Sequence, residues 1–581
     1  MVSGAPSDAA GRKLFTRQAS GLVREVSVTN ALFFNTAAFV GTGVGWYPVF
    51  YTLAFIPVGT AGFTTYGWAA IIVGAFCVLL GLIFASLSSV MPRSGGDYVF
   101  TSRLIPRAGP LLGWVESFTL VFAAIAIIAF EVPIVLRNLQ ITGRIVGIGT
   151  GIGFFEEANG WFAEGGVITG WPGFLGALLV LALIFWVVVQ PTRRFHRIVT
   201  GLAALSLASA VVMFVFGLLL IDRGAFEANL PRYAGVTVQE LAAFARDNGF
   251  KGTGVGILDP PGTGALIPFS IFSFMAAILL LNYIGFQYSA YIAGEVTGDV
   301  KRGILVAVLG ALGIAVWFNS IYTDLLSFRL GLDTQLGWGG MFWFGDPGLP
   351  LGQPNSLPLL AEISRPGLWP LWAFVSLAGA IFPFLLCPVY INFISRIALA
   401  WSLDRQVPEW FGEVNERLRA PLNAILTALG IAVVFAILQN FPILPDAVAP
   451  PEGKLNLVAT LWFSITMAFL TWFMPGLNAL VGPFARRDLL SGAPWRRWLP
   501  VMGVVWMLFV GILYWYAGFA PIVDFLGRAP GESAFQYFNR TGLTFTIVFF
   551  ALAVLIYAVQ AARRRAQGID VGLMYREIPP E

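Results

Sequence analysis

The sequence predicts an all-α integral membrane protein with about twelve membrane-spanning helices. Three observations predict this class: the composition, the repeated apolar segments, and the positions of the basic residues. Hydrophobic residues make up 57% of the 581 residues and charged residues only 11%. A soluble domain carries about 25% charged residues, because its surface faces water. The surplus of apolar side chains is therefore expected to face lipid.

Apolar segments long enough to span a membrane recur along the whole chain. About 20 mostly apolar residues are needed to cross a hydrocarbon core of roughly 30 Å. The expected spans are 28–56, 66–91, 110–136, 171–190, 198–221, 266–294, 304–327, 367–400, 421–440, 455–480, 499–520 and 541–561.

The basic residues predict the orientation. If both termini lie in the cytoplasm, most of the 35 Lys and Arg residues fall in short inner segments, as in Arg193, Arg194 and Arg197. This distribution follows the positive-inside rule. We therefore expect a multi-pass protein of the cell (plasma) membrane with cytoplasmic termini.

The spans divide the chain into segments. We expect a cytoplasmic N-terminal segment (1–27), spans one to five (28–221), a long outer loop (222–265), spans six to ten (266–480), spans eleven and twelve (481–561) and a cytoplasmic tail (562–581). Further long outer connections are expected at 137–170 and 328–366. Loops of such length carry structure of their own or a function such as a lid.

Composition also excludes several kinds of site. Cys77 and Cys387 lie inside apolar runs, so neither a disulfide framework nor a metal site is expected. His196 is the one histidine, and its basic neighbours indicate a solvated loop residue. The net charge of +4 reflects the inner loops rather than nucleic-acid binding. No cofactor and no catalytic residue are expected, and the sequence does not indicate an oligomeric state.

Two spans contain sequences that disfavour a continuous helix. The first holds Gly41-Thr42-Gly43-Val44-Gly45, and the sixth holds Asn282-Tyr283-Ile284-Gly285-Phe286-Gln287-Tyr288. Freed backbone groups are tolerated at mid-depth where they line a buried, wet cavity. Either cluster alone is equally compatible with close helix packing. Interrupted helices at matching positions in two halves favour a transporter site.

Four motifs carry a resemblance to a known family. Met91-Pro92-Arg93-Ser94-Gly95-Gly96-Asp97-Tyr98 follows span two, and Tyr283 through Glu295-Val296 covers the inner half of span six. Ser395-Arg396-Ile397-Ala398 precedes Asp404, Pro408 and Pro421, and Gly41-Thr42-Gly43 lies in span one. Together they resemble the amino acid–polyamine–organocation (APC) superfamily over about residues 28–480.

The resemblance implies a leucine-transporter-like fold. Spans one to five and six to ten would form two inverted repeats with broken helices 1 and 6, and the last two spans would be peripheral. It also implies a substrate site formed by Phe39, Val40, Gly41, Thr42, Gly43, Asn282, Tyr283, Gly285, Phe286 and Gln287. Thr42 and Gly43 would bind a carboxylate through backbone N–H groups, and Phe286 would act as an aromatic gate.

Charged residues give two further candidates. Arg24 and Asp404 would pair as an inner gate, as the resemblance implies, although two unrelated surface charges are an equal alternative. Glu116, in the inner third of span three, is a candidate proton-coupling residue, because buried ionisable groups are costly and usually functional. Span five lacks the lysine of some proton-coupled relatives, and span eight lacks the hydroxyls of sodium-coupled ones. The coupling ion therefore stays open between proton and sodium.

The predicted function is a secondary active transporter that moves an amino acid or related amine by alternating access. A membrane sensor of amino acids is the alternative, and a membrane-embedded enzyme fits less well because acid–histidine pairs are absent. The predicted partners are a small-molecule substrate and the lipid bilayer. No acidic residue adjoins Gly41 or Gly285, which disfavours a strongly cationic substrate.

Overall fold

The computed structural model describes 24–39, 65–164, 168–247, 276, 279–280, 282–331, 334, 357–415, 418, 420–445, 453–455, 457–514, 534–568 and 575. These residues are almost entirely helical. Extended pairing among them is limited to three isolated bridges, such as the parallel bridge between Val26 and Val296. The predicted all-α fold class is confirmed for this part of the chain.

Nine helical segments in the described ranges are long and apolar enough to cross a membrane. They are α3 (Thr65–Val90), α5 (Gly109–Thr150), α7 (Gly170–Val188), α8 (Thr192–Leu220), α12 (Val300–Trp317) with its π-helical extension Phe318–Tyr322, α16 (Trp369–Gly379) with α17 (Ile381–Leu403), α18 (Leu422–Asn440), α19 (Leu457–Met467) with α20 (Phe469–Ala485), and α24 (Ala534–Ala566). Shorter helical pieces occupy the other three expected spans: α1 (Val28–Ala37), residues 282–283, and α22 (Leu499–Tyr514).

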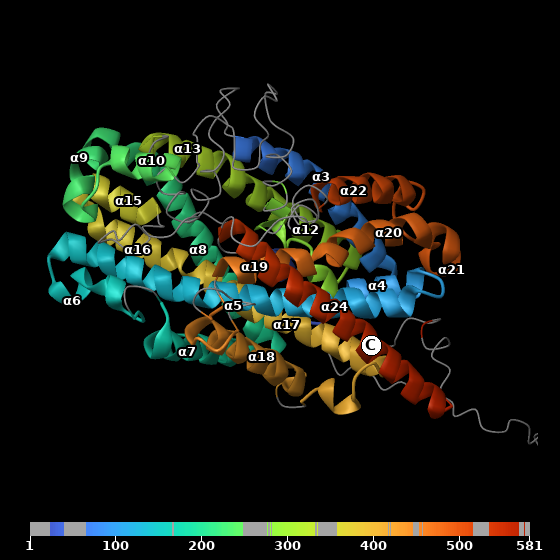
Figure 1. The fold of residues 1–581 in the computed structure, drawn as a ribbon. Coiled ribbons are helices and arrows are strands. Elements are labelled where there is room, and N and C mark those ends of the chain that lie inside the picture. The colour runs from blue at the N-terminus through green and yellow to red at the C-terminus, as the bar shows by residue number, and fades with distance from the viewer. Residues whose placement is uncertain are drawn as a thin grey trace, which may run out of the picture.

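The long helices run side by side, and α5 passes through the middle of the bundle (Figure 1). One end carries α9 (Arg223–Ala234), α10 (Val238–Asp247), α13 (Thr323–Leu330) and α15 (Leu357–Ser364). The opposite end carries α4 (Asp97–Leu104), α21 (Arg487–Leu490) and the C-terminal end of α24. We call the latter the basic end, because the inner loops predicted from the Lys and Arg positions meet there.

Local sequence explains how helices start at the basic end. Ser27 caps α1 by accepting a hydrogen bond from the backbone N–H of Asn30 at 3.2 Å. Asp299 caps α12 in the same way, accepting from the N–H of Arg302 at 3.2 Å. Such caps satisfy backbone donors that the first helical turn leaves free. The start of α12 is therefore set by Asp299, close to the predicted 304.

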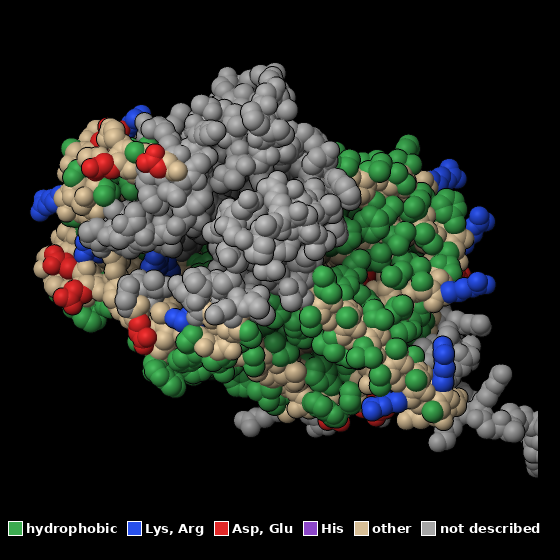
Figure 2. All heavy atoms as spheres, viewed as in Figure 1, with side chains coloured by type: hydrophobic (Ala, Val, Ile, Leu, Met, Phe, Trp, Pro, Cys, Tyr) green, Lys and Arg blue, Asp and Glu red, His purple; other side chains and the backbone are tan. Residues whose placement is uncertain are grey.

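Apolar side chains cover the middle of the bundle surface, whereas charged side chains gather toward its ends (Figure 2). Trp171 and Leu219 are 64% and 68% exposed, and Leu555 on α24 is 59% exposed. Exposed apolar residues in a continuous band mark contact with lipid. The surface thus agrees with the membrane prediction from composition.

The connections at the end opposite the basic end contain more helix than expected. The predicted loop 137–170 begins as helix, because α5 continues to Thr150 before the short α6 (Gly153–Glu156). At 42 residues α5 is about 60 Å long, so it extends well beyond the hydrocarbon core. The predicted loop 222–265 contains α9 and α10, and α15 lies within 328–366. Asn229 of α9 donates to the Ile363 carbonyl of α15 at 2.9 Å, which joins two of these connections.

Candidate functional site

The end of α1 and the break in the sixth span lie directly against each other. Helix α1 ends at Ala37, and the helical residues 282–283 give way to a turn at 284–287. Gly285 has φ +107°, and a Cβ at this position would overlap the Ala38 carbonyl oxygen. Only glycine combines that backbone angle with so close an approach. The predicted interruption of span six is therefore present, and it packs on the end of α1.

Side-chain hydrogen bonds also join α1 to the sixth span near this contact. The Asn35 amide donates to the Ser289 hydroxyl at 3.0 Å, and its carbonyl oxygen accepts from the Ser289 backbone N–H at 2.6 Å. Ser289 lies in η3 (Tyr288–Tyr291), the 3₁₀ continuation of span six. Both residues are fully buried. Sequence reasoning missed this pair, although each is a polar residue inside an apolar run.

The segment before α1 also pairs with the end of the sixth span. The backbone N–H groups of Glu25 and Val26 both donate to the Glu295 carbonyl, at 3.1 and 2.9 Å. The Glu295 side chain forms a bidentate ion pair with Arg396 of α17, at 2.8 and 3.1 Å. Both side chains are almost completely buried. A buried pair of this geometry fixes the inner half of span six to α17.

The predicted substrate-binding residues fall into three groups. Phe39 is described and buried, whereas Val40, Gly41, Thr42 and Gly43 lie outside the described residues. Asn282, Tyr283, Gly285, Phe286 and Gln287 are all described and lie at the break. The structure therefore brings Phe39 and the span-six residues into one region, next to the end of α1.

The side chains of span six differ in what they contact. Tyr283 donates to the Ala70 carbonyl at 2.8 Å, so its hydroxyl is engaged with α3. Asn282 donates to Asn319 at 3.3 Å. Phe286 is fully buried near Gly81 of α3. Gln287 is also fully buried, and its side-chain oxygen and nitrogen have no hydrogen-bond partner among the described residues. Since buried polar groups are almost always paired, Gln287 is the strongest candidate for a ligand contact.

A group of buried acids lies beside η3. Asp97, the first residue of α4, accepts a hydrogen bond from the Tyr291 hydroxyl. Glu116 of α5 accepts from the Thr101 hydroxyl at 2.5 Å, and Thr101 in turn accepts from Asn478 at 2.8 Å. Asp97 Oδ1 and Glu116 Oε1 have no hydrogen-bond partner in the described ranges. Burial raises the pKa of Asp97, and the hydrogen bond from Tyr291 opposes that rise.

Gly96 brings Asp97 close to Tyr291. Gly96 has φ +49°, and a Cβ there would overlap the Tyr291 ring. The Gly95 backbone N–H donates to the Tyr291 carbonyl at 3.1 Å. The glycines of the Ser94-Gly95-Gly96-Asp97 segment thus allow the loop after span two to pack on the broken sixth span. Sequence reasoning recognised the motif but did not assign Asp97 a role.

The predicted gate pair does not form in this structure. Asp404 is paired with Arg103, with Nη2 at 2.6 Å from Oδ2, and also accepts from the Tyr98 hydroxyl at 2.9 Å. Arg24 is exposed at the start of the described chain. The arginine that pairs with Asp404 is Arg103 of α4 rather than Arg24. Helix α4 lies across the end of α17, whereas Arg24 lies in the extended segment before α1. A gating role for Asp404 stays a prediction.

The C-terminal tail joins the same cluster. The Tyr575 ring lies 5.1 Å from the Arg103 guanidinium carbon, and its hydroxyl accepts from Gln406. Arg564 donates to the Asp404 carbonyl at 2.6 Å. Tyr575 is 4% exposed. We call Tyr98, Arg103, Asp404, Gln406 and Tyr575 the Asp404 cluster.

The sequence interpretation of His196 was wrong about exposure. His196 is buried rather than solvated: it lies in the first turns of α8, with its ring 5.6 Å from that of Phe34 on α1. Helix α8 begins at Thr192, so the basic sequence around His196 is a helix with one buried face.

The bundle of long apolar helices, with the end of α1 packed on the interrupted sixth span, defines a multi-pass helical membrane protein. The chain belongs to the amino acid permease family, whose model, described as "Amino acid permease", matches residues 32–538. This confirms the family predicted from the four motifs.

Two curated relatives are similar to the chain at low identity. An aspartate-proton symporter of Bacillus subtilis (strain 168) is 21% identical over 368 residues, which cover 63% of this chain and 59% of the symporter. An uncharacterized transporter of Rhizobium meliloti (strain 1021) is 21% identical over 403 residues, 68% of this chain and 69% of that protein. The match with the symporter thus spans less than two thirds of its length.

Proposed function

We propose that this protein is a secondary transporter that carries an amino acid or related amine across the cell membrane by alternating access, with both termini in the cytoplasm. The observation that carries the proposal is the contact between the end of α1, at Ala38, and the broken sixth span, at Gly285. Half-helix ends at such a break present backbone N–H and C=O groups to a polar substrate. Membership of the amino acid permease family supports the same function.

The name of one relative suggests which substrate to test first. A similar protein is called an aspartate-proton symporter. No acidic residue directly adjoins Gly41 or Gly285 in the sequence, and this favours a neutral or acidic amino acid over a polyamine. We therefore propose aspartate as the first substrate to test, followed by neutral amino acids.

Uptake into proteoliposomes tests the transport proposal. Replacing Gln287 by Ala removes a buried amide that we expect to bind the substrate, so KM should rise by at least about tenfold. Gln190→Ala is the matched control, because Gln190 donates to the Trp186 carbonyl at the end of α7. Unchanged KM in Gln287→Ala would remove Gln287 from the site. Specific binding without counterflow of labelled substrate would instead support the sensor alternative.

We propose protons as the coupling ion, with Asp97 and Glu116 as the proton-binding pair. Each has one buried oxygen without a partner in the described ranges, and the two carboxyl groups interact electrostatically. Two buried carboxylates that interact are costly when both are charged, so we propose that the pair holds a proton. The Tyr291 hydroxyl donates to Asp97, and Tyr291 belongs to the broken sixth span. Protonation of Asp97 would therefore alter a hydrogen bond at the interruption of this span.

Neutral variants test the proton proposal. In Asp97→Asn and Glu116→Gln we expect loss of uptake driven by a proton gradient, while counterflow, which needs no net proton movement, continues. Glu413→Gln is the control, since Glu413 is exposed. A sodium gradient that drives uptake equally in wild type and both variants would contradict proton coupling.

A further inference from the structure

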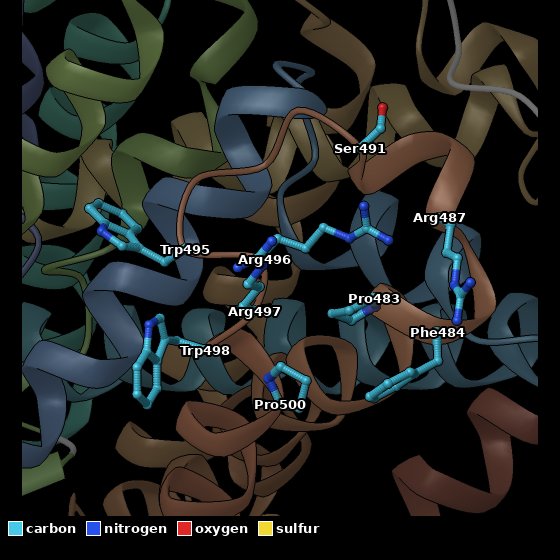
Figure 3. A pocket seen from close by; sticks show the side chains of 9 residues that line it. All are labelled: Pro483, Phe484, Arg487, Ser491, Trp495, Arg496, Arg497, Trp498 and Pro500. Atoms are coloured by element: carbon cyan, nitrogen blue, oxygen red, sulfur yellow. The ribbon is translucent and has the colours of Figure 1, made fainter.

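A surface hollow lies at the basic end, away from the broken spans. Its volume is about 710 Å³, and it is formed by the end of α20, by α21 and by the loop into α22 (Figure 3). The residues around it are Pro483, Phe484, Arg487, Ser491, Trp495, Arg496, Arg497, Trp498 and Pro500. We call these residues the arginine hollow.

The arginine hollow carries positive charge that no ion pair among the described residues neutralises. Arg487, Arg496 and Arg497 line it, and none of them has an ion pair in the part of the chain that the structure describes. Asp488, the chain neighbour of Arg487, is bound by Arg486 at 2.9 Å. A further cation adjoins the hollow, because Lys301 Nζ lies 5.4 Å from the Trp495 ring centroid. Unpaired guanidinium groups of this kind bind phosphate oxygens well.

The walls of the hollow are apolar and continue onto the lipid-facing side of α22. Phe484 and Trp498 are each 63% exposed. Beyond them, Val501 and Leu508 of α22 are 54% and 60% exposed. In Figure 3 the two tryptophans lie on one side of Arg496 and Arg497, and Phe484 lies on the other. Tryptophan is typical of the membrane interface, where its ring meets both headgroups and acyl chains.

We propose that the arginine hollow binds the headgroup of an anionic phospholipid, with its acyl chains lying along α22. Charge complementarity supplies the phosphate contact, as in basic pockets between spans that bind lipid headgroups. A soluble phosphate would use the three arginines but would leave the exposed Phe484, Trp498 and Val501 without a role. The continuous apolar surface therefore favours a lipid over a free anion.

Thermal stability of the purified full-length protein in neutral detergent tests the site. Phosphatidylglycerol and phosphatidylcholine with identical chains are titrated as mixed micelles, because a ligand that binds the native state raises the Tm. The site variant combines Arg487→Gln, Arg496→Gln and Arg497→Gln. The matched control combines Arg193→Gln, Arg194→Gln and Arg197→Gln, which removes three exposed arginines from the start of α8 and gives the same net charge.

We expect phosphatidylglycerol to stabilise the wild type and the control variant more than phosphatidylcholine does. Each arginine near an anionic lipid contributes roughly a fivefold change in affinity, so the site variant should need about a hundredfold more phosphatidylglycerol. Replacing the same three arginines by Lys keeps the charge and should restore most of the response. If the site variant is already unstable in phosphatidylcholine, the single variant Arg497→Gln replaces it in the lipid titration. The Arg497 side chain is exposed, so we expect this substitution to leave the fold intact.

Two results would overturn the proposal. Equal responses of the site and control variants to phosphatidylglycerol would show that the lipid effect does not come from the arginine hollow. Stabilisation by sodium phosphate as large as that by phosphatidylglycerol, at the ionic strength of a sodium chloride control, would show a soluble-anion site instead.

Discussion

At the scale of single residues, buried polar groups distinguish positions that hold the fold from positions available for function. Asn35, Ser289, Glu295 and Arg396 are paired with each other or with backbone, so their buried polar atoms are satisfied. Gln287 is buried without a partner in the described ranges. An unpaired buried polar group costs about 1–3 kcal/mol, so a substrate that pairs it recovers that free energy on binding.

Glu362 provides a prediction at this scale. It lies in α15, outside the spans, with both carboxyl oxygens buried and without a partner among the described residues. Burial raises the pKa of Glu362 to about 9. Between its ordinary pKa of 4.5 and 9, the folded protein holds a proton that the unfolded chain releases. The free energy of unfolding therefore falls as pH rises through this range.

Glu362→Gln removes this dependence, so we expect the variant to have a higher Tm than the wild type at pH 8 and a similar Tm near pH 4.5. Thermal unfolding at a series of pH values measures the difference. Glu157→Gln, an exposed acid at the same end, should follow the wild type. A Glu362→Gln variant with the wild-type pH profile would show that the carboxyl group is ionised in the folded protein.

At the scale of elements, segments far apart in sequence hold the basic end together. Helix α4 lies against α5 and α20, and Arg103 connects it to the end of α17. Tyr575, after α24, belongs to the Asp404 cluster, and Arg564, in the last turn of α24, donates to the Asp404 carbonyl. Because the ion pair between Arg103 and Asp404 is fully buried, loss of one partner would leave an uncompensated charge.

The tail gives a prediction for this element. Tyr575→Ala removes the ring beside Arg103 and the hydroxyl that accepts from Gln406, so we expect a loss of about 1–2 kcal/mol in the free energy of unfolding. Hydrogen exchange in residues 563–568 should become faster. Tyr575→Phe keeps the ring and should retain most of the protection. Equal exchange in Tyr575→Ala and wild type would show that the tail is held by Arg564 alone.

At the scale of the whole molecule, both ends of the described chain lie at the basic end. Val26 pairs with Val296 near the start of α12, and Arg564 contacts Asp404 at the end of α17. An even number of membrane crossings between them follows from this arrangement. We propose that the basic end faces the cytoplasm, because the positive-inside rule predicts basic loops on that side.

Cysteine labelling tests this orientation in intact cells. The two natural cysteines are free but buried, so they provide an unreactive background. We expect a membrane-impermeant maleimide to label Phe154→Cys, whose native side chain is 66% exposed at the end opposite the basic end. Arg193→Cys should react only after the cells are opened. The reverse pattern would place the basic end outside.

The sequence predicted correctly those structural features that depend on residues close together in the chain. Apolar length located the spans, with α7 and α18 within two residues of their predicted bounds. The glycine in Tyr283-Ile284-Gly285 located the break in span six, because positive φ is a local property of the chain. It was less informative at helix ends, as at α5, which continues to Thr150 although the predicted span ends at 136.

Composition and local pattern thus determined the membrane class, the spans, the family motifs and the broken sixth helix. The tertiary structure decided the pairings: Arg103 rather than Arg24 beside Asp404, Asn35 with Ser289, Tyr291 with Asp97, and the burial of His196. Hydropathy acts over the length of one helix and can be read along the chain. A buried ion pair or hydrogen bond between residues hundreds of positions apart depends on how the helices pack, because only packing brings the two groups within bonding distance.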